Sequence, residues 1–448
     1  MIVSTNPLDE QDVLAEAREL DAADVRKAAT TAREAQLGWA AEPAARATAL
    51  TRAANEVEQH AAELAGLVVR EVGKPVVEAE GEVARTVALL RFHAQAALAP
   101  TGEVVPPADG RGLLLTRKAP RGVVGLVTPY NFPLAIPVWK AAPALALGNA
   151  VLLKPSPLAL ATAERLVELL GRHLPDGVLT CLPGGAETGA ALLEVVDALS
   201  FTGSTAAGKA VAIAAAGRQL PVQTENGGHN SAIVLPDADV DGVAAVVARD
   251  VVGFAGQKCT STRRVLVAGS ADAFTAALLA AIERLPVGDP TRRDVVAGPL
   301  VTRAAAESVE RAVEACGPGV VRVPVEAGSP YVAPAVVRDD EGTTLAAREE
   351  LFGPVVVVQQ VRDADEAVQV ANSSPARLVA AVHTRDLDRA LAVADRLRAG
   401  MVRVNAPSTG VDLHAAFGGE GDSGYGPREQ GRAADALFTV ERTITIRS

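Results

Sequence analysis

The feature that most constrains this chain is an alternation of short apolar runs and helical segments that begins at Gly122. The apolar runs predict strands at GVVGLVT, AVLLKPS, VLTCLPG, ALSFTGS and PVQTEN, and the periodic segments PVWKAAPALALG and LATAERLVELLGRHL predict helices among them. Strands that alternate with helices of this length form βαβ units around a mostly parallel sheet. Such a sheet binds ligands beyond the carboxyl ends of its strands, so functional residues are expected there.

The rest of the chain predicts three further regions. Residues 22–99 predict successive helices, because apolar residues recur every three to four positions. Residues 100–121 predict a β-hairpin around Pro-Ala-Asp-Gly, and the final segment ALFTVERTITIRS predicts one more strand. Between them, residues 229–429 repeat the alternation, with strands expected at NSAIVLP, RRVLVAG, PVVVVQQV, VAAVHT and GMVRVN. The expected fold class is therefore α/β, and 448 residues suit two domains with a small appendage.

Charge and residue usage exclude several kinds of partner. The net charge of −11 argues against nucleic acid or an anionic membrane as the main partner. Charge, glycine or proline interrupts every long apolar stretch, and MIVSTNPLDEQ lacks the features of a signal peptide, so no membrane span is expected. Three cysteines provide no disulfide framework and suggest a reducing, cytoplasmic location. The six scattered histidines form no cluster with metal-ligand spacing, so no metal is expected.

Two residues together suit nucleophilic catalysis. Cys259 lies in GFAGQKCTSTRR, where Gln257, Lys258 and Thr260 suit a tight polar loop that presents a thiol. An inert core cysteine is the alternative. Glu225 ends a predicted strand and precedes two glycines that let backbone approach a ligand closely. Its carboxylate could remove a proton from the thiol or from water, and the alternative is a solvated surface glutamate.

Three further motifs lie at predicted strand ends. Asn131 lies in TPYNFPLAIP, where Pro129 and Pro133 fix the backbone on both sides. A rigid amide suits donation to an oxyanion, and turn capping is the alternative. FTGSTAAGK opens a helix with two glycines, where backbone N–H groups favour a phosphate. Lys154 in LLKPSP could reach a ribose or a phosphate.

Taken together, these segments resemble the motifs of the aldehyde dehydrogenase superfamily, in the family's order and from about Asn6 to the final strand. TPYNFP is similar to its PWNFP segment, LLKPSP to its lysine motif, FTGSTAAG to its phosphate-binding turn, ENGG to its E-L/M-G-G motif, GQKC to its nucleophile loop and EELFGP to its E-I/L-F-G-P motif. The resemblance implies three residues with catalytic roles, Cys259, Glu225 and Asn131. It implies cofactor contacts from Thr128, Pro129, Tyr130, Lys154, Ser156, Gly203, Ser204, Glu350 and Phe352, of which Glu350 would hold the nicotinamide ribose and Phe352 would flank the nicotinamide.

The resemblance also implies a domain organisation. A Rossmann-like cofactor domain is expected at residues 1–99 and 121–228, and an α/β catalytic domain at residues 229–429. A small β element that bridges subunits is expected at residues 100–120 and 430–448, so the chain is expected to form a homodimer or homotetramer. The chain starts late for this family, so the family's N-terminal strand pair is expected to be missing.

The implied reaction oxidises an aldehyde in two stages. The Cys259 thiolate attacks the aldehyde, and the Asn131 amide and the Cys259 backbone N–H stabilise the alkoxide. Hydride then leaves to the nicotinamide of NAD or NADP, and Glu225 activates the water that hydrolyses the thioester. A coenzyme A-acylating relative is one alternative, although such enzymes usually lack the glutamate. A non-catalytic binding protein of the same fold is the other.

Some residues depart from the family pattern. Pro157 stands where NAD-preferring members often carry a glutamate that binds the adenosine ribose, so NADP acceptance is favoured. Less usual residues that leave loop geometry and substrate preference open are Asn226, Tyr130, Arg377, Ala416 and Gly421. GQKCTSTRR and GVDLHAAFGGEGDSGYGPREQG look most like the branch that oxidises α-ketoglutarate semialdehyde. Arg263 could anchor the distal carboxylate of such a substrate, with a surface or subunit-interface position as the alternative.

Overall fold

The computed structural model describes residues 1–99, 101–325 and 328–447. Within these residues the strands form a six-stranded sheet, a seven-stranded sheet, a three-stranded arm and two small ribbons. The first sheet has the order β19 (Gly424–Tyr425), β9 (Val222–Glu225), β8 (Ala198–Thr202), β5 (Val123–Val127), β6 (Ala150–Lys154) and β7 (Leu179–Cys181). The second sheet has the order β12 (Val320–Arg322), β13 (Ala335–Arg338), β14 (Val355–Gln360), β11 (Thr262–Val267), β10 (Asn230–Val234), β16 (Val379–His383) and β17 (Met401–Val404).

Helices connect these strands, as the alternation predicts, and the α/β fold class is confirmed. Neighbouring strands are parallel in both sheets except β9–β19 and β12–β13. The helices are α1 (Ala22–Ala41), α2 (Pro43–Gln59), α3 (Ala61–Val72), α4 (Val76–Ala96), α5 (Ala135–Ala146), α6 (Leu160–Gly171), α7 (Ala186–Leu193), α8 (Thr205–Gly217), α9 (Val240–Val252), α10 (Ala271–Ile282), α11 (Arg303–Glu314), α12 (Leu345–Arg348), α13 (Ala364–Ser373), α14 (Leu387–Ala394) and α15 (Asp435–Phe438). Among the described helices, none is long and apolar enough to cross a membrane.

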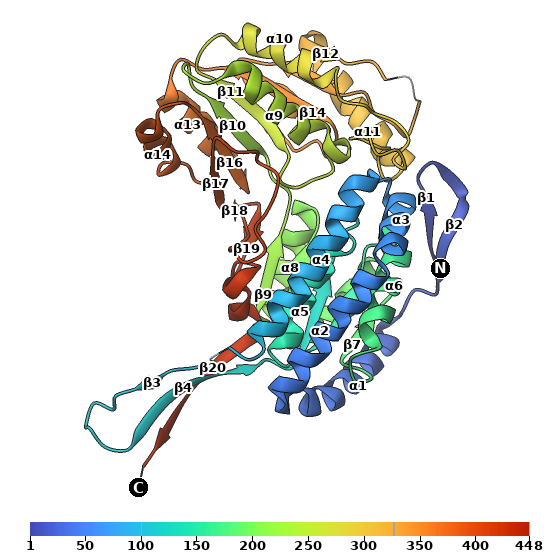
Figure 1. Cartoon of the computed structure of the whole chain (residues 1–448), viewed down its shortest axis with the longest axis vertical. Helices are drawn as coiled ribbons and strands as arrows, with labels where there is room; N and C mark the ends of the chain where they lie inside the picture. Colours follow the sequence, from blue (N-terminus) through green and yellow to red (C-terminus); the bar gives the residue numbers. More distant parts are fainter. Residues whose placement is uncertain (100, 326–327, 448) are drawn as a thin grey trace.

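The first sheet is buried on both faces, which explains why its strands are continuous apolar runs. In β6, Val151 and Leu153 join a core with α2, α4 and α5, whereas Ala150 and Leu152 join a second core with α1. Successive side chains of a strand point to opposite faces, so one apolar strand supplies both cores. Figure 1 shows this helical layer beside the first sheet and the second sheet in the other lobe.

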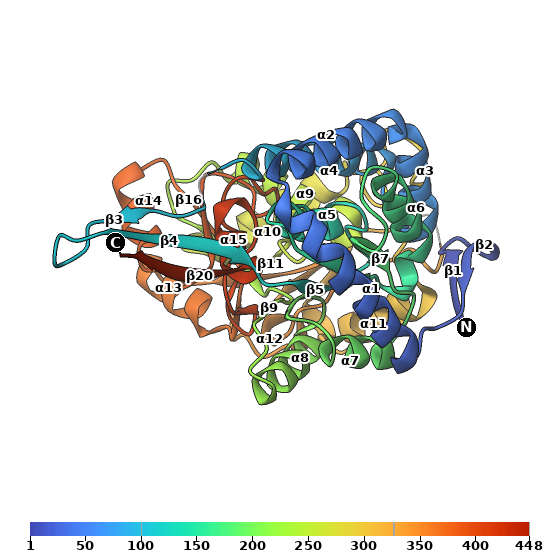
Figure 2. The same cartoon turned by 90° about the horizontal axis from the view of Figure 1, so that it is seen from below.

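The three-stranded arm confirms the predicted hairpin and terminal strand. It consists of β3 (Val104–Val105), β4 (Leu113–Pro120) and β20 (Thr439–Ile446), with β4 in the middle and both pairings antiparallel. The arm stands away from the body of the molecule (Figures 1 and 2). It exposes apolar side chains, among them Val104 and Ile446, which are 73% and 51% exposed.

The expectation that the N-terminal strand pair is missing is wrong. β1 (Ile2–Asn6) pairs antiparallel with β2 (Asp9–Ala17). Most of β2 is exposed or half-buried, so its sequence carries little apolar pattern. β1 instead buries Ile2 and Ser4 against α3 and the short 3₁₀ helix Pro157–Ala159. The predicted strands of the second sheet are all present, but β12 and β13 were not predicted.

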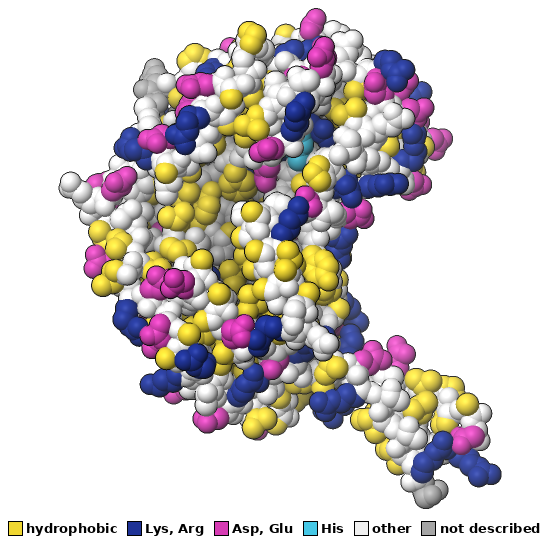
Figure 3. Space-filling model, turned by 180° about the vertical axis from the view of Figure 1, so that it is seen from behind, with side chains coloured by type: hydrophobic (Ala, Val, Ile, Leu, Met, Phe, Trp, Pro, Cys, Tyr) yellow, Lys and Arg dark blue, Asp and Glu magenta, His cyan; other side chains and the backbone are white. Residues whose placement is uncertain are grey.

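The two sheets meet end to end. Strands β5, β6, β8 and β9 of the first sheet end at the same edge, as parallel strands must. The segments that precede β10, β11, β14 and β16 enter the second sheet from the facing side. The space-filling view shows the molecule hollowed between the two lobes, with hydrophobic side chains gathered there and the arm projecting below (Figure 3).

A buried carboxylate fixes the N-terminal ribbon to this framework. Glu71 in α3 is 1% exposed and accepts hydrogen bonds from Ser4 Oγ (2.5 Å) and from the backbone N–H groups of Ala161 (2.7 Å) and Thr162 (2.8 Å). These two N–H groups belong to the first turn of α6, where a helix has no internal acceptors. One side chain therefore joins β1, α3 and α6.

Replacing Glu71 with alanine should lower the melting temperature by several degrees, because each buried donor left without a partner costs about 1–3 kcal/mol. Glu63→Ala is the matched control on α3: Glu63 is 48% exposed and pairs with Arg165 at the surface, where such pairs contribute about 0–1 kcal/mol. Differential scanning fluorimetry compares the two variants. Equal melting temperatures would contradict this role of Glu71.

Candidate active site

A cavity of about 700 Å³ lies where the two sheets meet. It is lined by segments that follow β5, β6, β8 and β9 and by segments that precede β10, β11, β14 and β16. Of the residues predicted to act in the site, Thr128, Pro129, Tyr130, Asn131, Ser156, Gly203, Ser204, Cys259, Glu350 and Phe352 line the cavity. Glu225 and Lys154 do not line it. The sequence thus indicated residues from distant segments that the fold brings to one place.

Cys259 lies in the nucleophile loop, defined here as residues 253–261, between α9 and β11. The loop contains two left-handed non-glycine residues, Phe254 and Ala255, each with φ 52°, and each such residue costs about 1–2 kcal/mol. Gly256 follows with φ 69°, and a Cβ there would lie 2.1 Å from the Gly353 carbonyl oxygen. The backbone of the strained nucleophile loop therefore packs directly against the segment that precedes β14.

The environment of Cys259 disfavours a free thiolate. Burial is the main cause that raises the pKa of its thiol, to about 12, and the nearby carboxylates of Glu350 and Glu225 act in the same direction. Only the Arg263 guanidinium and the Cys259 backbone N–H lower this pKa. Lys258 does not assist, because its Nζ pairs with Glu78 at 2.8 Å. A base or a bound ligand must therefore favour the thiolate before it can attack.

Asn131 and Tyr130 are fixed to the nucleophile loop through Gln257. The Asn131 amide donates to the Gln257 carbonyl oxygen at 2.9 Å, and Tyr130 Oη contacts Gln257 Oε1 at 3.2 Å. An asparagine amide has two N–H donors, so the other remains for an oxyanion. The Tyr130 ring packs edge-on against Phe352, with ring centroids 6.3 Å apart. Asn131 is 4% exposed and lines the cavity, so it is not simply a turn-capping residue.

Glu225 ends β9, as predicted, but it is not a surface residue. It is 3% exposed, and its Oε1 accepts a hydrogen bond from Gln223 Nε2 at 3.2 Å. Its Oε2 has no hydrogen-bond partner in the described part of the chain. Burial, and then the Glu429 carboxylate, raise the pKa of Glu225 well above its usual value. A carboxyl group with a raised pKa is a stronger base near neutral pH than a solvated one.

A chain of buried donors leads from Lys140 to Glu225. Lys140 Nζ donates to Ser200 Oγ at 2.6 Å and also pairs with Glu429. Ser200 Oγ donates to Gln223 Oε1 at 2.6 Å, and the other end of that amide donates to Glu225. Lys140 and Glu429 are both nearly inaccessible, so their charges must offset each other. Sequence reasoning missed this chain, although a lysine inside the apolar segment PVWKAAPALALG was a signal.

Residues expected to bind a dinucleotide line the same cavity. Ser204 caps α8 by accepting from the Ala207 N–H, and Ser204 and Thr205 both line the cavity, so the N-terminus of this helix, where a phosphate is favoured, faces it. Thr128 Oγ1 is buried there without a partner among the described residues. A Cβ at Gly227 would lie 1.8 Å from Glu350 Oε2, so glycine is required for Glu350 to reach its place. The helix end, the Thr128 hydroxyl and the Glu350 carboxylate are thus all groups that could contact a dinucleotide.

Lys154 lies deeper, at the end of β6. Its Nζ donates to the carbonyl oxygens of Pro155 and Gly184, both at 2.9 Å. Burial lowers its pKa to about 8. An ammonium group has three N–H donors, so these two carbonyl oxygens leave one donor for the ribose contact that the motif implies.

Both expectations for Arg263 are wrong. Its side chain is 2% exposed, so it lies neither on the surface nor free to bind a substrate carboxylate. It donates to backbone carbonyl oxygens of the nucleophile loop and of Gly353, and it pairs with Glu350 at 3.5 Å. The side chains of β11 alternate, and Arg263 points toward the nucleophile loop and the segment before β14. Arg264 points the other way, toward Ser231 Oγ and the Val370 carbonyl oxygen.

Two other departures from the family pattern occupy one small ribbon. β15 (Ala376–Arg377) pairs with β18 (Glu420–Gly421), so Arg377 and Gly421 lie close together. Arg377 donates to the Ser374 carbonyl oxygen at 2.7 Å, and a Cβ at Gly421 would lie 3.2 Å from Arg377 Nη2. Asn226 also lines the cavity and donates to the Asp422 carbonyl oxygen. These replacements are accommodated by the local backbone.

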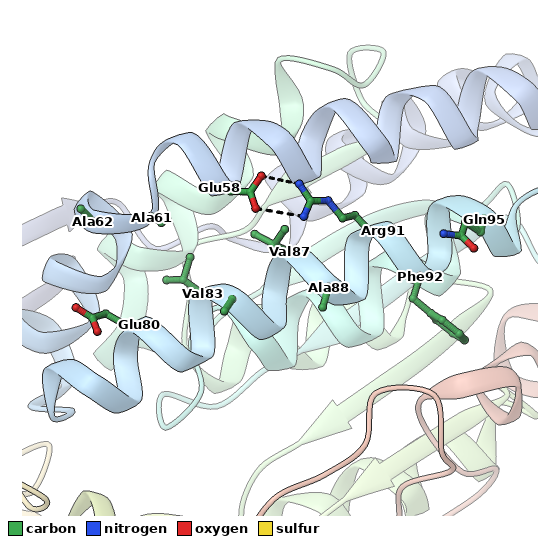
Figure 4. Close-up of a pocket in the computed structure, with 11 residues that line it drawn as sticks. Glu58, Ala61, Ala62, Glu80, Val83, Val87, Ala88, Arg91, Phe92 and Gln95 are labelled. Carbon is green, nitrogen blue, oxygen red and sulfur yellow. Dashed lines mark hydrogen bonds and ion pairs between the residues drawn. The ribbon is translucent and has the colours of Figure 1, made fainter.

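A second hollow, also of about 700 Å³, lies on the outer face of α2, α3 and α4 (Figure 4). Its lining is mostly alanine and valine, and the Glu58–Arg91 pair spans it between α2 and α4. It contains no cysteine or histidine. Across the described residues, no group of three or more His, Cys, Asp or Glu side chains could hold a metal ion. The cavity around Cys259 is therefore the candidate active site.

Comparison with known proteins identifies the family to which the chain belongs. The model of the aldehyde dehydrogenase family matches residues 1–444. An alpha-ketoglutaric semialdehyde dehydrogenase from Bacillus subtilis is 36% identical, over 100% of this chain and 95% of its own length. Two crystal structures have the same fold. An NAD-dependent aldehyde dehydrogenase from Sinorhizobium meliloti has a TM-score of 0.95 and 34% identity, over 100% of this chain and 91% of its own. An NADP-dependent glyceraldehyde-3-phosphate dehydrogenase from Bacillus halodurans, complexed with NADP, has a TM-score of 0.94 and 30% identity, over 100% of this chain and 95% of its own. The chain belongs to the aldehyde dehydrogenase family and is an oxidoreductase that acts on aldehydes.

Proposed function

We propose that the chain oxidises its aldehyde through a thioester on Cys259, with Asn131 as an oxyanion donor and Glu225 as the base for hydrolysis. The observation that carries the proposal is that Cys259 and Asn131 line one cavity together with Asn226 and Gly227, the two residues that directly follow the buried Glu225. The residues proposed to bind a dinucleotide, among them Ser204, Glu350 and Phe352, line the same cavity. A bound nicotinamide would supply the hydride acceptor.

The first half of the reaction uses the nucleophile loop. Cys259 sulfur bonds to the aldehyde carbon, and the thiol proton passes to a base. The carbonyl oxygen becomes an alkoxide, which the free N–H of the Asn131 amide and the Cys259 backbone N–H stabilise. Removing one such donor typically costs about 2.7–4 kcal/mol of barrier. Departure of hydride from the same carbon leaves a thioester on the sulfur.

The second half uses Glu225. The carboxylate turns from its position beside Gln223 toward the cavity and removes a proton from the water that attacks the thioester. Water oxygen bonds to the acyl carbon, the carbon–sulfur bond breaks, and the thiol and a carboxylic acid form. The donor chain from Lys140 supports the resting position of Glu225 and offers the proton a path away from the cavity.

Glu225→Gln should separate the two halves. The first turnover should release about one NAD(P)H per active site, and the steady-state rate should fall by about 10²–10⁴-fold because the general base is lost. Stopped-flow absorbance at 340 nm measures both phases. Cys259→Ser should show no burst, while Cys316→Ser, which changes a buried cysteine outside the cavity, should behave as the unaltered protein. Full steady-state activity in Glu225→Gln would refute the assigned base.

The absence of a carboxylate at position 157 favours NADP as an accepted cofactor. Pro157 begins the 3₁₀ helix after β6, three residues beyond Lys154. A proline there neither binds ribose hydroxyls nor repels a 2′-phosphate. The NADP complex of the Bacillus halodurans structure and the NAD dependence of the Sinorhizobium meliloti protein indicate that both cofactors fit this fold.

We expect kcat/KM with NADP to equal or exceed that with NAD. Pro157→Glu should lower kcat/KM for NADP by at least about tenfold, because the new carboxylate repels the 2′-phosphate, and should leave the value for NAD nearly unchanged. Initial rates with both cofactors measure the ratio. A strong preference for NAD in the unaltered protein would exclude the proposal.

The substrate proposed is a short aldehyde that carries an acid group, such as α-ketoglutarate semialdehyde. Likeness to the Bacillus subtilis alpha-ketoglutaric semialdehyde dehydrogenase supports it. Because Arg263 is buried among backbone carbonyls, it does not supply the cation for that acid group. In this proposal a group other than Arg263 recognises the acid.

Aldehydes with an ω-carboxylate should have a kcat/KM at least about tenfold above that of plain aldehydes of equal length, because a site built for a polar group discriminates against analogues that lack it. A panel of matched pairs, with and without coenzyme A, measures the difference. Faster turnover of the plain aldehydes would exclude an acid substrate, and coenzyme A dependence would identify the acylating alternative.

The arm is proposed to bridge subunits in a homodimer or homotetramer. Its three strands project from the body and expose apolar side chains to solvent in the single chain (Figure 3). Exposed apolar surface of this kind marks an interaction site. Light scattering measures the assembly directly.

A further inference from the structure

Arg263 joins the two loops that carry the reacting thiol and the carboxylate proposed for the cofactor ribose. Its Nη2 donates to the carbonyl oxygens of Gly256 (2.8 Å) and Lys258 (3.1 Å), both in the nucleophile loop. Its Nη1 donates to the Gly353 carbonyl oxygen at 2.9 Å. Its guanidinium also pairs with Glu350 and lies 5.7 Å from the centre of the Phe352 ring.

We propose that Arg263 is a positioning residue that clamps the nucleophile loop to the loop of Glu350 and Phe352, so that the thiol and the cofactor-binding carboxylate keep one spacing. This inference rests on the proposed function, because it gives a role to those two groups. It replaces the carboxylate-binding role that the sequence suggested for the same residue.

The clamp needs an arginine for geometric reasons. A guanidinium is planar and presents five N–H donors, so one side chain can serve carbonyls of two loops at once. A lysine ammonium keeps the charge but is a compact point donor, which cannot span the same set of acceptors in one orientation. The burial of Arg263, at 2% exposure, leaves no water to replace it.

The loop that Arg263 clamps is strained, which makes an external restraint necessary. Phe254 and Ala255 both have left-handed backbone conformations, and Gly256 directly follows them. Strained backbone of this kind persists only where surrounding contacts over-determine it. Arg263 binds the carbonyl at the end of this run, directly before the reacting segment.

The charge of Arg263 has a second effect on the thiol. The Glu350 carboxylate raises the pKa of Cys259, and the Arg263 guanidinium lowers it. Removing the guanidinium should therefore raise the thiol pKa further and reduce the thiolate fraction at any pH below it. A shift of one pKa unit lowers that fraction about tenfold. The charge of Arg263 is thus expected to affect the pKa of the thiol, whereas its planar shape is expected to affect the spacing of the two loops.

Three variants separate these consequences from a loss of stability. Arg263→Gln removes both the positive charge and the planar guanidinium, whereas Arg263→Lys keeps the charge and removes only the guanidinium. Arg264→Gln is the control, because it removes an equally buried arginine on the other face of β11. Two readouts apply to each variant. NADPH fluorescence titration gives the cofactor Kd, and iodoacetamide labelling of Cys259 across pH, located by peptide mass mapping, gives the thiol profile.

We expect Arg263→Gln to raise the cofactor Kd by at least about fivefold and to move the labelling profile to higher pH. Arg263→Lys should weaken cofactor binding but keep the profile near that of the unaltered protein. Arg264→Gln should lower the melting temperature and change neither readout.

If Arg263→Gln changes only the melting temperature, as Arg264→Gln does, the clamp is merely structural and the inference is wrong. If Arg263→Gln does not fold, Arg263→Lys decides, and an unchanged cofactor Kd would overturn the inference. A failure of the proposed function would give another result, because the Cys259→Ser variant would then keep its activity. The cofactor Kd of the Arg263 variants would still test the clamp in that case.

Discussion

The site depends on a close approach between the segments that enter the second sheet at the end that faces the first sheet. Gly256 of the nucleophile loop lies against the Gly353 carbonyl oxygen, and Gly227 lies against the Glu350 carboxylate. A Cβ at Gly256 would collide with the Gly353 backbone, so these two loops could not meet at their present spacing, and a Cβ at Gly227 would displace the Glu350 carboxylate. Because Cys259 follows the first contact by three residues, the position of the thiol is set by how tightly these segments pack. The fold supplies the approach, and hydrogen bonds then fix it.

Buried charges surround this contact, and each is stable only through its partners. Lys140 is held against Glu429, and Arg263 against Glu350 and the loop carbonyls. An unpaired charge in such a place would cost several kcal/mol. The charges therefore restrict the loops to one arrangement, and they also determine the electrostatic environment of the thiol. The same charged side chains therefore serve catalysis and folding, because the groups that shift the pKa of the thiol are also buried charges that need a partner.

The features that could be predicted from the sequence are those that depend on a local pattern of residues. Apolar runs located the strands of both sheets except β12, β13 and β19, because burial on two faces leaves a continuous apolar run. Motif segments located the residues that line the cavity. The N-terminal ribbon escaped prediction because it is held by Ser4 and Glu71 rather than by its own pattern. The role of Arg263 was not predicted, because the alternation of a strand indicates which way a side chain points but not which acceptors it meets. The Lys140–Glu429 pair was not predicted either, because 289 residues separate its two members in the sequence. Such pairings appear only in three dimensions.

If Cys259 forms the proposed thioester, its thiol carries the acyl group during turnover. Intact-mass and peptide mass spectrometry can detect this group in the Glu225→Gln protein, quenched after mixing with aldehyde and NADP. We expect a mass increase of one acyl group per chain on the peptide that contains Cys259. An adduct on Cys181 or Cys316, or none while NADPH is formed, would contradict it.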